Sequence, residues 1–217
     1  MEINVTKLTD VTLLRKANGF TTGRDSNMTL ETAYRIGHSP IRTQMFWVEC
    51  HDIPLCVASH LVRHPIGVTW FQRTKRPDRG GEDFTEVCEN LAQATMGVMD
   101  ITHRPRKQMM DFVFEIADTI KTLPDRFDRH APTDLAFICN AETLMNIAHA
   151  RLCHKAALET RLVVSAICEK VKDVDPALYP HLVPKCIYRG GICREPKSCG
   201  FNKSSLGLKM LNQYKQL

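Results

Sequence analysis

Basic residues that could bind an anion gather at the end of a segment whose pattern predicts a helix. In this segment, residues 54–65, Arg63 and His64 stand directly before Pro65. The fork of an arginine can hold two phosphate oxygens, and a histidine can donate or accept a proton near neutral pH. The same residues could instead only complement the dipole at the C-terminal end of the helix. Spacing alone leaves both interpretations open.

The same segment contains three residue types that can ligate a metal. Cys56, His60 and His64 follow one another at a spacing of four, which places them on one face of a helix. Histidines at this spacing can bind zinc, but the segment lacks the glutamate of the metalloprotease pattern and has no obvious fourth ligand. We therefore expect no metal there.

A second segment, residues 140–161, combines amide and basic side chains with an apolar stripe at helical spacing. Asn146 and Arg151 lie off this stripe. Between the two segments, residues 73–82 form a charged loop that contains Gly80 and Gly81 and has four cations around Thr74. Such a loop could wrap phosphates, although a run of charges is more often a solvated surface.

In this order, the segments resemble the flavin-dependent thymidylate synthases. That family carries a Gly-His-x-(Ser/Thr)-Pro type of motif, which residues 37–41 (Gly-His-Ser-Pro-Ile) resemble in compressed form. Its signature helix ends in Arg-His-Arg, where this chain has Arg63, His64 and Pro65. The family's closing helix has a pattern whose residue types and spacing are matched by Asn140, Asn146, Arg151, Ala156 and Glu159. The segment 184–200 resembles that of divergent, phage-borne members.

The resemblance implies an α+β fold, with a central, mostly antiparallel sheet and a helical layer. It also implies a homotetramer in which FAD and deoxyuridylate share a site made by several subunits. A reduced flavin, regenerated by NADPH, would assist the transfer of a one-carbon unit from methylenetetrahydrofolate to C5 of the uracil. For such an assembly we expect the apolar faces around 54–62 and 144–152 to be partly buried against a symmetry mate.

The resemblance assigns roles residue by residue. The residues closest to the chemistry would be Arg63, His64 and Arg151. The flavin would contact Ser39, Thr43, Arg63, His64, Asn140 and Asn146. The pyrimidine deoxynucleotide would contact His60, Arg63, Thr74, Arg76, Arg129 and Arg151.

Two departures from the family pattern concern charge. Pro65 replaces the third cation of the signature, and proline has no N–H to donate. Glu142 places a negative charge where the family has an arginine that meets the flavin. Flavin binding could therefore be altered, or the chemistry changed.

Three alternatives to thymidylate synthesis remain open. One is C5 hydroxymethylation of a uracil or cytosine nucleotide. Another is a non-catalytic nucleotide-binding protein that has lost flavin chemistry. The third, a nucleic-acid-binding protein that uses residues 73–79, has little support because aromatic residues make up only 7% of the chain and no recognised binding motif is present.

The composition favours a reduced intracellular compartment. The net charge of +5 suits an anionic ligand but is too small for a dedicated nucleic-acid binder. The N-terminus does not resemble a secretory signal, and no apolar stretch is long enough to span a membrane. Nine cysteines, an odd count, fit reduced thiols better than a disulfide framework. We expect a cytoplasmic protein, in the host cytoplasm if it is phage-encoded.

Periodicity and turn residues predict the elements that must position these side chains. We expect strands at 3–8, 44–50 and 67–72. We expect helices at 30–36, 54–64, 84–100, 107–122, 135–155 and 156–172. No linker or repeat divides the chain, so a single domain over residues 1–217 is the simplest interpretation.

The C-terminal tail from about residue 175 is rich in cysteine, glycine and proline, and we expect it to be irregular. Cys186, Cys193 and Cys199 are spaced more widely than the pairs of a zinc ribbon. Cys168 or His181 could supply a fourth ligand. We nevertheless expect packing to hold the tail and zinc to be present at less than one equivalent.

Overall fold

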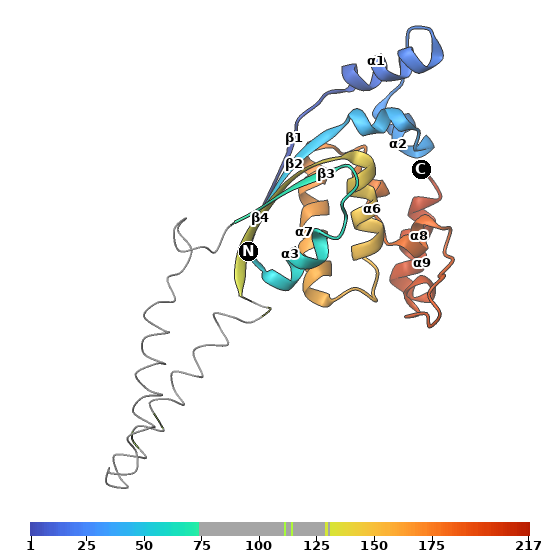
Figure 1. The fold of residues 1–217 in the computed structure, drawn as a ribbon. Helices are drawn as coiled ribbons and strands as arrows, with labels where there is room; N and C mark the ends of the chain where they lie inside the picture. Colours follow the sequence, from blue (N-terminus) through green and yellow to red (C-terminus); the bar gives the residue numbers. More distant parts are fainter. Residues whose placement is uncertain (74–110, 112–113, 115–128, 130) are drawn as a thin grey trace. The chain divides into compact units, whose positions relative to one another are not determined.

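The computed structural model describes residues 1–73, 111, 114, 129 and 131–217. Residues 1–72 and 132–217 form one compact unit. In this unit a four-stranded antiparallel sheet carries helices on one face (Figure 1). The expected α+β class is confirmed. The single domain over residues 1–217 remains a prediction, and the helices expected at 84–100 and 107–122 lie outside the described residues apart from Asp111 and Phe114.

The strands are β1 (Glu2–Lys7), β2 (Met45–Pro54), β3 (Val68–Gln72) and β4 (Pro132–Asn140), and their order in the sheet is β1-β2-β4-β3. The strands expected at 3–8, 44–50 and 67–72 are therefore confirmed, with β2 longer than predicted. Its register shifts between Cys50 and Ile53, where Asp52 adopts a positive φ of 55°. The amide of Asp52 donates to Asp134 Oδ1 on β4 at 3.0 Å, which fixes this irregularity.

The helix expected at 135–155 is wrong in its first part, because β4 occupies residues 132–140. Leu135, Phe137 and Cys139 are fully buried, and the residues between them are only partly so. This period of two is that of a strand with one covered face. The apolar composition of the segment hid the alternation, and the helix starts only after Asn140.

Three helices cover the sheet: α3 (Leu55–Leu61), α6 (Ala141–Arg151) and α7 (Leu158–Val174). Their apolar faces are buried within the chain, as the exposed fractions of 0–2% for Leu61, Leu144 and Ile147 show. The faces around 54–62 and 144–152 are therefore core surfaces, and the expectation that they meet a symmetry mate is wrong. Burial against the chain's own sheet already satisfies them.

The connection between β1 and β2 contains α1 (Val11–Thr22), α2 (Leu30–Ile36) and the 3-10 helix η1 (Ser39–Thr43). The prediction of α2 is confirmed, since Thr29 accepts from the amide of Thr32 as its N-cap and Gly37 ends it at φ 71°. The sequence analysis did not predict α1, although Asp10 caps its first turn.

The tail is more ordered than expected. It contains η4 (Tyr179–His181), α8 (Lys185–Tyr188), η5 (Phe201–Lys203) and α9 (Ser205–Tyr214). These elements enclose a small core of their own, made of Val183, Ile187, Phe201 and Leu211. Among the helices of the described residues, none has the length and apolar character that crossing a membrane requires.

A buried charged network ties β1 to the end of α7 and to α2. The Nζ atom of Lys7 lies 2.7 Å from Asp175 Oδ2, and the hydroxyl of Tyr34 donates to the same oxygen at 2.7 Å. The other oxygen, Oδ1, accepts from the amide of Leu178. Asp175 is 1% exposed, so these partners satisfy a carboxylate that would otherwise be costly to bury.

Candidate functional site

Arg63 and His64 lie just beyond the end of α3, and Arg151 is the last residue of α6. Helix α3 ends at Leu61, three residues before the expected end at His64. The Nε atom of Arg151 donates to Nε2 of His64 at 3.0 Å, and Nη2 donates to the carbonyl of His60 at 2.7 Å. The structure therefore brings together the ends of the two segments that the sequence analysis singled out.

The two arginines lie close together without an acidic partner. Burial lowers the pKa of Arg151, and the positive charge of Arg63 lowers it further. Within the described residues, neither guanidinium forms an ion pair with a carboxylate, and Arg63 is exposed. Two neighbouring cations without a compensating acid favour an anionic ligand.

His64 is held neutral beside these arginines. Burial lowers its pKa, and the charge of Arg151 adds to this effect. Because Nε2 accepts a hydrogen bond from Arg151, the proton of the neutral ring resides on Nδ1. The carbonyl of His64 accepts from Trp70 Nε1 at 3.2 Å, which anchors the backbone to β3. His64 can thus offer a hydrogen-bond donor without adding charge.

His60, predicted to contact the nucleotide, is partly buried, and its Nδ1 lies 2.8 Å from the hydroxyl of Thr160 on α7. Its carbonyl holds Arg151. One ring nitrogen of His60 and one of His64 thus form hydrogen bonds with other protein groups. Among the described residues, no group of three or more His, Cys, Asp or Glu is arranged to hold a metal ion.

The loop after His64 runs along α6 toward its N-terminal end. The hydroxyl of Thr143 donates to the carbonyl of Ile66 at 2.9 Å, and Asn140 caps α6 by accepting from the amide of Thr143. Gly67 has a φ of 69°, and a Cβ there would collide with Thr143 Oγ1 and Asn140 Nδ2. This close approach keeps the loop against the helix.

The other residues predicted to contact the flavin also lie along α6. Asn146 is exposed, although Met145 and Ile147 on either side are buried. Ser39 is exposed in η1, which packs beside the start of α6, and the hydroxyl of Thr43 donates to the carbonyl of Pro40 at 2.7 Å. An 11-residue helix spans about 16 Å, so polar groups from Asn140 to Arg151 offer room for an elongated ligand.

Glu142, the negative charge that departs from the family pattern, is paired. Arg42 donates to its two carboxylate oxygens, from Nε at 2.7 Å and from Nη2 at 3.3 Å. Sequence reasoning missed Arg42, although it directly precedes the predicted contact Thr43 in the chain. Arg42 therefore compensates the negative charge of Glu142.

Three predicted nucleotide contacts remain predictions. Thr74 and Arg76 lie outside the described residues. Arg129 is exposed, and it belongs to the segment 73–131, not to the unit that carries the other residues.

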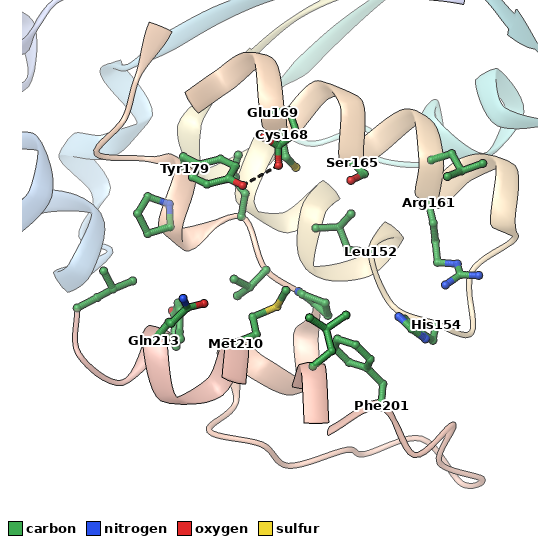
Figure 2. A pocket seen from close by; sticks show the side chains of 18 of the residues that line it. Leu152, His154, Arg161, Ser165, Cys168, Glu169, Tyr179, Phe201, Met210 and Gln213 are labelled. Carbon is green, nitrogen blue, oxygen red and sulfur yellow. Dashed lines mark hydrogen bonds between the residues drawn. The ribbon is translucent and has the colours of Figure 1, made fainter. Parts of the chain in front are cut away.

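A cavity of about 560 Å³ lies elsewhere, between α7 and α9 (Figure 2). Its lining is mostly apolar, and Figure 2 shows the hydrogen bond from Tyr179 to Glu169, 2.6 Å long, at its wall. None of the predicted site residues lines this cavity. It is therefore separate from the arginine site.

Fold and site together define an α+β protein with two neighbouring arginines where α3 and α6 end. Residues 14–177 match the family described as thymidylate synthase complementing protein. The flavin-dependent thymidylate synthase of Clostridium tetani is 36% identical over an alignment of 196 residues, and the match covers 80% of this chain and 77% of that one. The chain belongs to the flavin-dependent thymidylate synthase family.

A solved structure agrees in fold. The crystal structure of thymidylate synthase X from Helicobacter pylori with FAD and dUMP matches with a TM-score of 0.55 at 15% identity. The match covers 84% of this chain and 99% of the other. At this identity, the likeness extends to the fold alone.

Proposed function

We propose that this chain is a flavin-dependent thymidylate synthase that binds FAD and dUMP and transfers a one-carbon unit to C5 of the uracil. Family membership gives the reaction class. The observation that carries the assignment is the pair Arg63 and Arg151, two neighbouring cations that lack a carboxylate partner among the described residues. A nucleotide phosphate is the anion that such a pair would bind.

In this proposal, Arg63 and Arg151 hold the phosphate through their forked donors. Arg151 is already oriented by His64 and by the carbonyl of His60, so little further ordering is needed on binding. His64, neutral and protonated on Nδ1, donates a hydrogen bond to a ring acceptor of nucleotide or flavin. The two arginines alone then compensate the negative charge of the phosphate.

Polar groups on and beside α6 suit FAD. Asn146, Asn140 and Ser39 offer amide and hydroxyl groups, and Arg42 offers a cation at the start of the helix. The flavin would supply the reducing equivalents for the one-carbon transfer. NADPH would regenerate the reduced flavin, and methylenetetrahydrofolate would donate the carbon. These two cosubstrates follow from the family resemblance.

We also propose that the protein is a homotetramer. The core faces of α3 and α6 are unavailable, but Ile66, two residues after His64, is 83% exposed, and Phe71, on the face of the sheet that carries no helices, is 50% exposed. Such residues are candidates for burial by a symmetry mate. Light scattering should show an assembly, and a strict monomer of 24.7 kDa at micromolar concentration would contradict the shared site.

The decisive experiment starts from the colour of the purified protein. We expect a flavin absorption spectrum and formation of dTMP from dUMP when NADPH and methylenetetrahydrofolate are supplied. A hydroxymethylated product, or a preference for dCMP, would move the function to the hydroxymethylation reaction. Binding of nucleotide without flavin would indicate the non-catalytic homologue instead.

A further inference from the structure

Four cysteines line one small cavity next to the tail. Cys186, Cys193 and Cys199 come from the tail itself, and Cys153 comes from the turn that follows α6. The cavity has a volume of about 30 Å³. Cys168 and His181, the two fourth ligands considered from the sequence, do not line this cavity. Cys153 does line it, although it lies about 30 residues before Cys186 in the chain.

The charged side chains around this cavity are mostly positive. Three cations, Lys185, Arg189 and Arg194, and one acid, Glu195, line it. The thiolate is the form of cysteine that ligates a metal, and this surplus of positive charge compensates the negative charge of thiolates.

The segment that carries Cys193 and Cys199 has little regular structure to hold it in place. Residues 189–200 contain no helix or strand, and residues 194–200 are all exposed. Gly190, Gly191 and Gly200 have positive φ angles of 70°, 92° and 80°, so the backbone turns sharply at both ends of the segment. The small core beneath it buries four apolar side chains. Small substructures with so little core are commonly held by a metal or a disulfide.

We infer that Cys153, Cys186, Cys193 and Cys199 form a structural zinc site. Four thiolates with no open position are a usual ligand set for structural Zn²⁺, and sharp turns allow them to surround one ion. The cavity has about the volume of one water molecule, which fits a single ion better than an iron–sulfur cluster. Zinc with four thiolates has a net charge of −2, which the three cations offset.

This inference replaces the expectation that packing alone holds the tail. Since no group of three or more ligands among the described residues is already arranged to hold an ion, the four sulfurs must draw together when zinc binds. His154 also lines the cavity, but its ring stacks on Phe201 at a centroid distance of 4.2 Å. We therefore assign the fourth position to Cys153.

The test is the zinc content of the full chain purified without chelator, measured by inductively coupled plasma mass spectrometry. We expect one equivalent in the wild type, in His154→Ala and in Cys168→Ala, which removes a buried thiol of α7 outside the cavity. Cys153→Ala and Cys193→Ala should hold zinc at least roughly tenfold more weakly in competition with a chelator. Cobalt in place of zinc should give the absorption of a tetrahedral thiolate site.

Well under one equivalent of zinc in the wild type would overturn the inference, as would iron in its place. Full retention by Cys153→Ala would remove the fourth ligand. If the cysteine variants are insoluble, thiol counting on the wild type decides. Four thiols should become reactive only when a chelator removes the metal, and unchanged reactivity would contradict the site. None of these outcomes depends on nucleotide or flavin binding.

Discussion

Arg151 donates from Nε to Nε2 of His64 over 3.0 Å, although the two residues are 87 positions apart in the chain. The bond joins the end of α6 to the loop after α3, and it orients a guanidinium that no described carboxylate neutralises. The proposed nucleotide site therefore exists only when both parts of the unit are folded together.

Loss of either arginine should weaken nucleotide binding. Arg151→Ala removes a charged hydrogen bond of ~1.5–3 kcal/mol, so the affinity for dUMP should fall roughly ten- to a hundredfold. Arg63→Lys should also weaken binding, because the charge remains but the fork is lost. Isothermal titration with dUMP and dCMP would measure both effects. Arg24→Ala, an exposed arginine of the loop after α1, is the control.

Equal affinities in the wild type, Arg63→Lys and Arg151→Ala would remove the nucleotide assignment. A fall in affinity in Arg24→Ala as well would point to a general effect of net charge.

The pair of Arg42 and Glu142 should influence flavin binding more than stability. Arg42 is largely exposed and Glu142 partly exposed, and ion pairs open to solvent contribute little to folding. Glu142→Gln frees Arg42 and removes a negative charge, so FAD should bind several-fold more tightly. Arg42→Ala should weaken FAD binding and leave the melting temperature almost unchanged. Quenching of flavin fluorescence would report both affinities, and weaker FAD binding by Glu142→Gln would contradict this role.

His149 should make the protein less stable in acid. Its ring is buried and stacks on Tyr188 at 4.3 Å, and Nε2 has no hydrogen-bond partner in the described structure. Burial lowers its pKa to about 4, against an ordinary value of 6.5. The unfolded chain therefore binds the proton more readily than the folded one. Stability is complete above about pH 6.5 and falls as the pH drops toward 4, by at most about 3 kcal/mol.

Urea denaturation between pH 4.5 and 7.5 would measure this loss. His149→Phe keeps an aromatic ring against Tyr188 but cannot titrate, so its stability should depend less on pH. The same slope in wild type and variant would assign the acid sensitivity to other groups, such as His181, whose pKa is also lowered by burial.

Asp175 should be important for stability but not for binding. Asp175→Asn leaves the partly buried Lys7 without its counter-charge, which costs up to about 3–5 kcal/mol. Asp173→Asn, an exposed acid two residues earlier on α7, is the matched control and should change little. Chemical denaturation would compare the two variants. An equally stable Asp175→Asn would show that the network adds no net stability.

The sequence predicted elements well where the local signals were unambiguous. Thr29 and Gly37 bracket α2, and both cap it as expected. The prediction from sequence failed for β4. This central strand has apolar residues on its covered face and also Ala136 and Ile138 on the other face, so its pattern resembles that of a buried helix. The sequence analysis also missed α1, in which three threonines, one asparagine and one glycine weaken the helical signal.

The site could be predicted as a set of residue types but not as a set of partners. Arg63, His64 and Arg151 were expected to act together, and the structure places them together. The pairing of Glu142 with Arg42 spans 100 positions, and the approach of Cys153 to the tail depends on how α8 packs against α6. Such contacts follow from the tertiary fold, and no local pattern in a single sequence indicates them.

The order of strands in the sheet constrains how this chain folds during synthesis. In the described unit, β3 has β4 as its single neighbouring strand, and β4 also closes the open edge of β2. β4 follows β3 only after residues 73–131 have been made. At ~5–20 residues per second, a ribosome needs roughly 3–12 s for this segment. For that time β3 has no strand to pair with, and α6 and α7, which cover the sheet, do not yet exist. We expect the first 72 residues to lack a packed core until α7 has emerged from the ribosome. Chaperones would have to protect them throughout that interval.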